Sequence, residues 1–324
     1  MDVSIVIPTK NAGKLLDRVL KNVFTQKTKY SYEVICVDSG SKDETLDIIN
    51  KYPCKLYQIP ASEFGHGKTR NYGAQQGSGE YIVFITQDAV PASDMWLQNF
   101  IDAMKLDSKI AGGFGIHYPY EDCNLLDVGG LKQHFLNFGT DNTIFSMEDD
   151  LKRYQNDPGY MQYIVFFSDN NACIKRSIWE KYPYPDVDFA EDQIWMRQMI
   201  EKGYKKVYCP FAPVYHSHNF PLKTYYQRYY DEYKGLYNIH KYVVADSWWQ
   251  LPVVWAKDVR RDLAYIRSCK ISKRKKLYWL GYSIARNYCK CYGGYKGGKY
   301  TSYSEKKQKR LDKKISQQYK QRNA

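Results

Sequence analysis

The stretch of the sequence best suited to chemistry places an acid directly after a strand-like run. Residues 81–85 (Tyr-Ile-Val-Phe-Ile) are apolar and predict a buried strand, and Asp88 follows shortly before Pro91. In an open α/β sheet, ligands bind in the crevice beyond the carboxyl ends of the strands. A carboxylate placed there can hold a cation or move a proton, although an exposed aspartate in a turn would give the same pattern.

Two further polar clusters occur later in the chain. Asp169-Asn170 follows an apolar segment, and Glu191-Asp192 precedes a predicted helix. Both clusters place polar groups at the edge of a hydrophobic element. The helix dipole alone would also favour two acids at the start of a helix, so a purely structural interpretation stays open for the second cluster.

A glycine-rich basic segment, residues 64–71, begins another predicted helix. Its two glycines, with Lys68 and Arg70, suit diphosphate oxygens, which favour a helix N-terminus and a bidentate guanidinium. The spacing of a Walker A loop is missing from this segment. A solvated basic turn is the alternative interpretation.

Polar residues also end the first two predicted strands. Thr9 follows the first, and Asp38-Ser39 follows the second. Their backbone and hydroxyl groups could hold a nucleotide base, with the Asp38 carboxylate accepting a hydrogen bond from a base N–H. Ordinary strand-to-helix turns have the same composition. No GxGxxG motif occurs in this region, which argues against a dinucleotide site.

Two histidines, His216 and His218, follow a short predicted strand. On a strand, residues two apart point the same way, so both imidazoles could bind one metal ion. In a turn, only one of them would face the site.

Strand-like and helix-like segments alternate in the first part of the chain. The predicted strands are residues 3–7, 33–37, 55–59 and 81–85. Between them, Asn11 is predicted to cap one helix, Ser41 and Glu44 to form a capping box for a second, and residues 67–76 to form a third. This alternation predicts βαβ units, and therefore an α/β fold with a mostly parallel sheet and flanking helices.

The pattern becomes less regular after Pro91. The predicted elements are a helix near 93–104, a strand near 109–116, an irregular insertion over 119–162, an apolar segment at 163–167, helices near 175–181 and 192–202, and short strands at 206–209 and 213–216. From residue 222 onward, aromatic and basic residues recur at helical spacing. We therefore expect one domain over residues 1–220 and a helical extension over 221–324.

The composition limits the class of protein. The 324 residues carry a net charge of +13, which suggests a polyanionic partner such as nucleic acid, an anionic membrane surface or a phosphorylated substrate. The 8 cysteines form no CxxC pair, which is typical of reduced thiols. No signal-like segment precedes the first strand, and no apolar run approaches the ~20 residues of a membrane-spanning helix. We expect a cytoplasmic protein.

Taken in order, these motifs resemble the family 2 inverting glycosyltransferases, which have the GT-A fold and use nucleotide-diphosphate sugars. The resemblance covers roughly residues 1–220. Many members carry Asp-x-Asp where this chain has Thr86-Gln87-Asp88. That variant, with His-Gly-x-Thr-Arg-Asn upstream and His-Ser-His downstream, is similar to the bacterial rhamnosyltransferase branch. Its members build cell-surface polysaccharides from dTDP-L-rhamnose.

The resemblance implies a role for each candidate residue. Thr9 and Asp38 would contact the base, and Arg70 would lie near the diphosphate. Ser39, Asn71 and Gln87 would also bind the donor. Asp88, with His218, would hold Mg²⁺ or Mn²⁺. Asp192, with Glu191 beside it, would be the general base, and Asp169 and Asn170 would line the sugar and acceptor pocket. A single displacement by the acceptor hydroxyl would invert the sugar, and a family 2 enzyme using UDP-glucose or UDP-galactose is the alternative.

The helical extension is rich in aromatic and basic residues, including the run at 273–276 (Lys-Arg-Lys-Lys). Such a composition is typical of helices that lie on an anionic membrane surface, and also of surfaces that stack nucleic-acid bases. A lipid-linked saccharide acceptor favours the membrane, so we expect the enzyme at the inner face of the cell membrane. Because no RNP, KH or zinc-finger signature is present, we expect no nucleic-acid partner.

Overall fold

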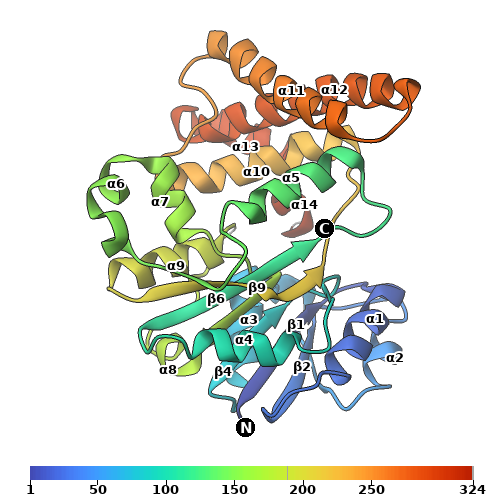
Figure 1. Cartoon of the computed structure of the whole chain (residues 1–324), viewed down its shortest axis with the longest axis vertical. Coiled ribbons are helices and arrows are strands. Elements are labelled where there is room, and N and C mark those ends of the chain that lie inside the picture. Colours follow the sequence, from blue (N-terminus) through green and yellow to red (C-terminus); the bar gives the residue numbers. More distant parts are fainter. Residues whose placement is uncertain (188, 323–324) are drawn as a thin grey trace. The chain divides into compact units, whose positions relative to one another are not determined.

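The computed structural model describes residues 1–187 and 189–322. The chain divides into two compact units (Figure 1). Unit 1 contains residues 1–120 and 131–217, and unit 2 contains residues 121–130 and 218–324. The boundary in the sequence prediction, 220/221, lies three residues from the division at 217/218. The assignment of residues 121–130 to unit 2 had no counterpart in the sequence analysis.

Unit 1 is built on one mixed sheet, whose path is β3-β2-β1-β4-β8-β6-β9-β5, with β7 paired to β9. The strands are β1 (Val3–Thr9), β2 (Tyr32–Asp38), β3 (Lys55–Gln58), β4 (Tyr81–Ile85), β5 (Val90–Pro91), β6 (Ile110–Tyr118), β7 (Thr143–Phe145), β8 (Asn171–Lys175) and β9 (Lys205–Tyr215). The first four strands pair in parallel, as predicted. β8 is antiparallel to both β4 and β6, while β6 and β9 are parallel.

This topology brings several chain segments to one edge of the sheet. The carboxyl ends of β1, β2 and β4 share that edge because the strands are parallel. β8 is antiparallel, so it begins there, and β6 and β9 end there. The segments after Thr9, Asp38, Ile85 and Tyr215 and the segment before Asn171 therefore lie along the same edge.

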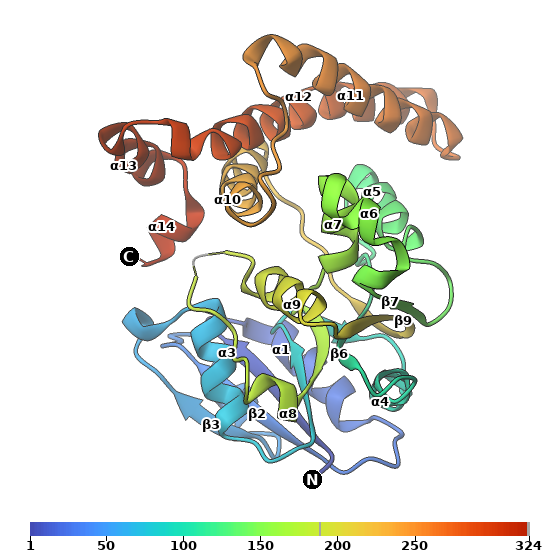
Figure 2. The same cartoon turned by 90° about the vertical axis from the view of Figure 1, so that its left-hand side faces the viewer.

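Helices cover both faces of the sheet (Figure 2). On one face, α1 (Gly13–Phe24), α2 (Thr45–Ile49) and α4 (Trp96–Met104) share a core with Val3, Ile5 and Ile7 of β1. On the other, α3 (His66–Gln75), α8 (Arg176–Trp179) and α9 (Glu191–Glu201) pack with Val6, as the alternation of side chains along a strand requires.

Residues 119–162 are not an irregular insertion, which corrects the sequence prediction. They contain α5 (Leu125–Leu136), β7, α6 (Leu151–Asn156) and the start of α7 (Pro158–Val165). Apolar side chains from this region, including Phe135, Phe138 and Tyr154, are buried. The many Asp, Asn and Gly residues cap or separate these short elements; for example, Asp157 accepts hydrogen bonds from the backbone of Gly159 and Tyr160 at the start of α7.

Both predicted helix caps are wrong for the same reason. Asn11 has a positive φ of 47° and accepts a hydrogen bond from the Lys42 N–H (2.8 Å), while α1 starts two residues later. Ser41 donates to Asp38 and accepts from the Asn11 N–H, while α2 begins only at Thr45. These residues tie the two turns to each other across the sheet edge, so they are not available to the helices.

Unit 2 is helical, as predicted. Its helices after residue 217 are α10 (Leu222–His240), α11 (Leu251–Ser268), α12 (Lys273–Gly298), α13 (Glu305–Lys314) and α14 (Gln317–Arg322). The 3₁₀ turns η3 (Trp248–Gln250) and η4 (Tyr300–Ser302) also lie in this unit. Unit 1 contains the 3₁₀ turns η1 (Ala61–Glu63) and η2 (Met147–Asp150). Over the described residues, none of the helices is long and apolar enough to cross a membrane.

Two glycines let α12 pack closely against α10. A Cβ atom at Gly293 would overlap the carbonyl oxygen of Tyr226, and one at Gly297 would overlap that of Tyr230. The two glycines are four residues apart, as are the two tyrosines, and this is about one helical turn, so the glycines of α12 face the carbonyls of α10 in register. The helices therefore meet backbone to backbone over this turn.

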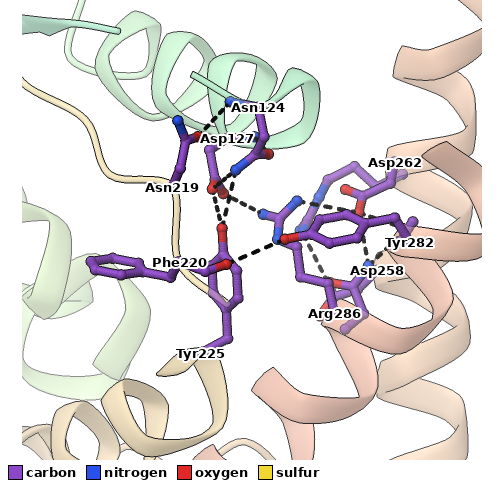
Figure 3. A network of polar contacts seen from close by, with 12 residues as sticks. Asn124, Asp127, Asn219, Phe220, Tyr225, Asp258, Asp262, Tyr282 and Arg286 are labelled. Atoms are coloured by element: carbon purple, nitrogen blue, oxygen red, sulfur yellow. Dashed lines mark hydrogen bonds and ion pairs between the residues drawn. The ribbon is translucent and has the colours of Figure 1, made fainter. Parts of the chain in front are cut away.

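A buried arginine connects three segments of unit 2 (Figure 3). Arg286 of α12 is 4% exposed, and its guanidinium lies 2.9 Å from Asp127 and 3.9 Å from Asp262. Tyr225 donates a hydrogen bond to Asp127, and Asp262 accepts from Ser283 (2.8 Å) and Asn287 (2.7 Å). Because the charge is paired inside a hydrogen-bonded network, this arginine can be buried.

Candidate active site

The ends of β1 and β2 form a closely hydrogen-bonded turn. The Asp38 carboxylate is buried and accepts from Thr9 Oγ1 (3.2 Å) and from the N–H groups of Gly40 (3.0 Å) and Ser41 (2.9 Å). Ser39 donates to the Thr9 carbonyl through its N–H and its hydroxyl. The structure thus brings Thr9, Asp38 and Ser39 together, with Asp38 shaping the turn. Their contact with a nucleotide base stays a prediction.

Gln87 has a structural partner that explains its side chain. Its Oε1 accepts from the Lys10 N–H (2.7 Å), and its Nε2 donates to the Lys10 carbonyl (3.2 Å). An amide can both accept from and donate to the same backbone residue, whereas an ionised carboxylate has no donor, so a carboxylate at position 87 would lose one of these bonds. Gln87 therefore joins the segment after β4 to the segment after β1.

Asp88, His216 and His218 form a possible metal site. Each offers one ligand atom, and these atoms lie within 4.8 Å of one another. His216 Nε2 is 3.5 Å from Asp88 Oδ1, and its ring packs against the buried His117, with ring centroids 5.3 Å apart. The chain leaves the end of β9 so that both histidines face Asp88. The donor set of one carboxylate and two imidazoles suits a divalent transition-metal ion.

A second charged cluster surrounds Arg70 of α3. Its Nη1 is 2.6 Å from Glu191 Oε1, and its Nε is 3.2 Å from Asp169 Oδ2. Asp169 also accepts from the Tyr184 hydroxyl (2.8 Å), and its own N–H donates to the Asp192 carboxylate (3.2 Å). The structure therefore brings Arg70, Asp169, Glu191 and Asp192 together. The guanidinium is buried among carboxylates, and its predicted contact with a diphosphate stays a prediction.

The acids of this cluster hold their protons unusually strongly. Burial raises the pKa of Asp192 to about 7, and the neighbouring Glu191 adds to the shift while Arg70 opposes it. Burial likewise raises the pKa of Asp169 to about 7, and again Arg70 opposes the shift. The pKa of Glu191 is also raised, mainly by burial. A general base works best when its pKa lies near the operating pH, which is the position of Asp192.

The backbone before Asp192 is strained. Ala190 adopts the left-handed conformation, with φ 58° and ψ 37°, directly before the first residue of α9. A residue with a Cβ in this region costs roughly 1–2 kcal/mol, and such strain collects at functional sites. Here it turns the chain so that Glu191 enters the buried cluster at the start of the helix.

Asn71 and Asn170 differ in their surroundings. The Asn71 amide accepts from Trp179 Nε1 (2.8 Å) and the Tyr184 N–H (3.1 Å) and donates to the Tyr184 carbonyl (2.9 Å). Its side chain thus holds the loop after α8. Asn170 is half-buried, and its carbonyl accepts from the Thr86 N–H (3.4 Å), which joins the start of β8 to the end of β4. Both predicted ligand contacts stay predictions.

Two further residues support the site and were not predicted from the sequence. Asn171 is fully buried, accepts from Trp96 Nε1 (2.9 Å) and donates to the Ala212 carbonyl (2.8 Å), so it fixes β8 to α4 and β9. His117 is buried beside His216, and burial lowers its pKa well below the usual value. Asn171 lies in the Asp-Asn-Asn run, but no pattern marked His117 in β6.

The sheet of unit 1, with helices on both faces, has the arrangement of the GT-A fold, and the two charged clusters lie along one edge of this sheet. The profile of glycosyl transferase family 2 matches residues 4–180, more than half of the chain. This chain therefore belongs to glycosyl transferase family 2, and it is an enzyme of the glycosyltransferase class.

Two curated relatives resemble most of the chain. The O-antigen chain rhamnosyltransferase RfbN of Salmonella typhimurium is 34% identical over 236 residues, which is 71% of each chain. WbaN of Salmonella anatum, with the same description, is 32% identical over 232 residues, or 70% of each chain.

Solved structures share the fold at low sequence identity. The mannosyltransferase PcManGT of Pyrobaculum calidifontis, solved with GDP-Man and Mn²⁺, has a TM-score of 0.58 and 16% identity over 93% of this chain and 86% of its own. Glucosyl-3-phosphoglycerate synthase of Mycobacterium tuberculosis, solved with Mn²⁺, UDP and glucosyl-3-phosphoglycerate, has a TM-score of 0.52 and 14% identity over 74% of this chain and 80% of its own.

Proposed function

We propose that this enzyme transfers L-rhamnose, with inversion, from dTDP-L-rhamnose to a hydroxyl group of a lipid-linked saccharide during synthesis of a cell-surface polysaccharide. The sugar and the pathway are supported by the similarity to RfbN and WbaN, both described as O-antigen chain rhamnosyltransferases. The observation that carries the reaction is the pair of charged clusters along one sheet edge, one around Asp88 and one around Asp192.

Asp192 is the proposed general base. Its carboxylate takes the proton of the acceptor hydroxyl as the oxygen attacks the anomeric carbon from the face opposite the leaving nucleotide. The Asp169 N–H and the Gln193 N–H hold the two carboxylate oxygens at 3.2 and 2.8 Å, so the group is oriented before the acceptor binds. Arg70 favours the charged form of the neighbouring acids and thereby keeps the pKa of Asp192 from rising further.

Asp88, His216 and His218 are the residues that would hold a divalent cation. Such an ion offsets the charge that develops on the departing nucleoside diphosphate. Because imidazole suits transition metals and Mg²⁺ prefers oxygen ligands, the two histidines favour Mn²⁺ over Mg²⁺.

A donor panel tests the proposed function. Purified enzyme is heated with dTDP-rhamnose, UDP-glucose, UDP-galactose, UDP-GlcNAc or GDP-mannose in the presence of Mn²⁺, and its unfolding temperature is followed. We expect the largest stabilisation with dTDP-rhamnose, since at equal ligand concentration the stabilisation of the folded state grows with the logarithm of one plus the ratio of ligand concentration to Kd. The proposal also requires that the enzyme transfers radiolabelled rhamnose from dTDP-rhamnose to a lipid fraction. If only a UDP-sugar stabilises the enzyme and is transferred, that sugar and not rhamnose is the one that the enzyme transfers.

Removal of the metal ligands is expected to reduce transfer strongly. Asp88→Ala and His216→Ala should each lower kcat by about 10² or more, since a metal ion supplies several kcal/mol of transition-state stabilisation. EDTA should inhibit the wild-type enzyme, and Mn²⁺ should restore activity better than Mg²⁺. The exposed Asp94, which pairs with Lys27 on the surface, gives the control variant Asp94→Ala. Full activity of the wild type in EDTA would exclude a metal requirement.

We also propose that unit 2 binds an anionic membrane surface. Trp248, Trp249 and Tyr278 are each more than 60% exposed, and α12 begins with the basic run at 273–276. Exposed aromatic side chains beside cations are typical of helices that lie at a bilayer interface.

The basic run is expected to account for much of this binding. Replacing Lys273, Arg274, Lys275 and Lys276 with Gln should weaken binding to anionic liposomes, since each cation contributes about 1 kcal/mol near such a surface. Co-sedimentation at increasing salt measures it, and transfer to a short soluble acceptor should be spared. The control variant replaces four lysines of unit 1 with Gln, and so removes the same charge; these are Lys21, Lys51, Lys105 and Lys109. Equal liposome binding by both quadruple variants would show that the run at 273–276 is not the anchor.

A further inference from the structure

A pocket in unit 2 is lined by cations from three helices. Its volume is about 440 Å³, and its walls include Lys223 of α10, Lys296 of α12 and Lys307, Arg310 and Lys314 of α13. Among the described residues that line it, none is acidic. A volume of this size is ample for a small ligand, since such pockets usually span about 300–1,000 Å³.

The arrangement follows from the sequence of α13. Lys307, Arg310, Leu311 and Lys314 are spaced i, i+3, i+4 and i+7, so they share one face of the helix. Asp312 points elsewhere, where it accepts from Tyr230 (2.9 Å), Tyr300 (2.6 Å) and Lys234 (3.0 Å).

Asp231 of α10 is an acid that is engaged in the same way. Asp231 accepts hydrogen bonds from the N–H groups of Gln317 (2.8 Å) and Gln318 (3.3 Å) at the start of α14. Both carboxylates are therefore committed to contacts within the unit, and neither lines the pocket. The cations of the pocket repel one another, and an anionic ligand would relieve that repulsion.

Parts of the pocket are held in place before any ligand binds. Lys296 Nζ donates to the Tyr226 hydroxyl (3.1 Å) and lies over the Tyr292 ring, 4.3 Å from its centroid. The buried Gln227 donates to the Ile315 carbonyl (3.0 Å), which fixes the end of α13 to α10. Arg310 adds a planar guanidinium, the group that binds phosphate oxygens in a bidentate manner.

We propose that this pocket binds the phosphate or diphosphate group of an anionic ligand. The inference does not depend on the sugar that the enzyme transfers, since no residue of the pocket belongs to the proposed catalytic machinery. The same phosphate chemistry is carried by a lipid headgroup and by a free phosphate compound, and the experiment separates these sources.

Isothermal titration calorimetry on the full chain tests the proposal. The probes are inorganic pyrophosphate, dihexanoyl phosphatidic acid below its micelle concentration, and dihexanoyl phosphatidylcholine, all in EDTA to prevent metal-dependent binding near Asp88. We expect binding of the first two probes and none of the third, whose phosphate is neutralised by choline. Pyrophosphate binding alone indicates a free phosphate ligand, and tighter binding of phosphatidic acid indicates a headgroup. If neither binds at millimolar concentration, the proposal is wrong.

Matched variants on one helix locate the binding. The triple variant Lys307→Gln, Arg310→Gln and Lys314→Gln should weaken binding at least about tenfold. The control triple Lys306→Gln, Lys309→Gln and Lys313→Gln removes the same charge from α13 residues outside the pocket lining and should change affinity less than about threefold. Equal losses in both would show non-specific attraction and overturn the proposal. If the first triple melts early, Arg310→Gln alone should still weaken binding relative to Lys309→Gln, and no difference between these two would equally overturn it.

Discussion

Asp192→Asn is expected to abolish most transfer while leaving donor binding nearly unchanged. The amide keeps the size of the carboxylate but cannot accept a proton, and a positioned base contributes roughly 10²–10⁴ in rate. Single-turnover transfer and a donor thermal shift, measured on the same preparation, separate the two effects. Asp94→Asn on the surface is the control for the substitution itself. Turnover close to wild type in Asp192→Asn would remove this residue from the mechanism.

The pH dependence of the wild type gives an independent check. The base must be deprotonated to act, and the pKa of Asp192 is raised to about 7. The rate of the chemical step should therefore rise with pH up to about 7 and level off above it. Arg70→Met removes the cation that favours the charged acids, so its rising limb should move to higher pH. A limb near pH 4 in the wild type would contradict the raised pKa.

Arg286→Met is expected to destabilise unit 2 more than any surface substitution. Removing one partner of a buried ion pair typically costs about 3–5 kcal/mol, because the remaining charges stay buried without compensation. Asp127 is partly exposed, with 23% of its side chain accessible, so we expect the loss of stability to lie near the lower end of this range. Urea unfolding followed by circular dichroism measures the loss, with the slope of the transition compared between variants.

Arg261 supplies the matched control for this experiment. It is also an arginine of unit 2 and pairs with Asp258 at 3.0 Å, but 64% of its side chain is exposed. Arg261→Met should therefore cost less than about 1 kcal/mol, as exposed pairs do. A double-mutant cycle with Asp127→Asn should give a coupling energy for the Arg286 pair. If Arg286→Met and Arg261→Met lower the free energy of unfolding equally, burial does not determine how much an ion pair contributes to stability.

Strands β1, β2 and β4 were predictable because each is built on a short apolar run that ends at a polar turn. β4 matches its predicted bounds of 81–85, and β1 and β2 extend the predicted runs by one or two residues. β8 was not assigned as a strand, although residues 171–175 are mostly apolar. Its antiparallel place between β4 and β6 is set by contacts across the sheet, which no local pattern encodes. The two strands predicted at 206–209 and 213–216 are one continuous strand, β9, because Pro210 interrupts the pattern and not the backbone.

The members of the site were easier to predict than their contacts. Acids at the ends of elements identified Asp88, Asp169, Glu191 and Asp192, since the topology of an α/β sheet gathers such ends. The burial of Arg70 between two of these acids was not predictable, because it depends on α3 and α9 packing on the same face of the sheet. The two hydrogen bonds between the Gln87 amide and the Lys10 backbone were equally unpredictable, since they join residues 77 positions apart.

The glycines at 293 and 297 limit how the sequence of this enzyme can drift over time. Each faces a carbonyl oxygen of α10 where even a methyl group has no room, so alanine at either position must push two long helices apart. Tyr292, beside them, is 37% exposed and can change at little cost. Among descendants of this chain, we therefore expect the exposed residues of α12 to vary while Gly293 and Gly297 stay unchanged. A larger residue at either position cannot be compensated by a smaller side chain on α10, because the atoms in the way are backbone carbonyl oxygens.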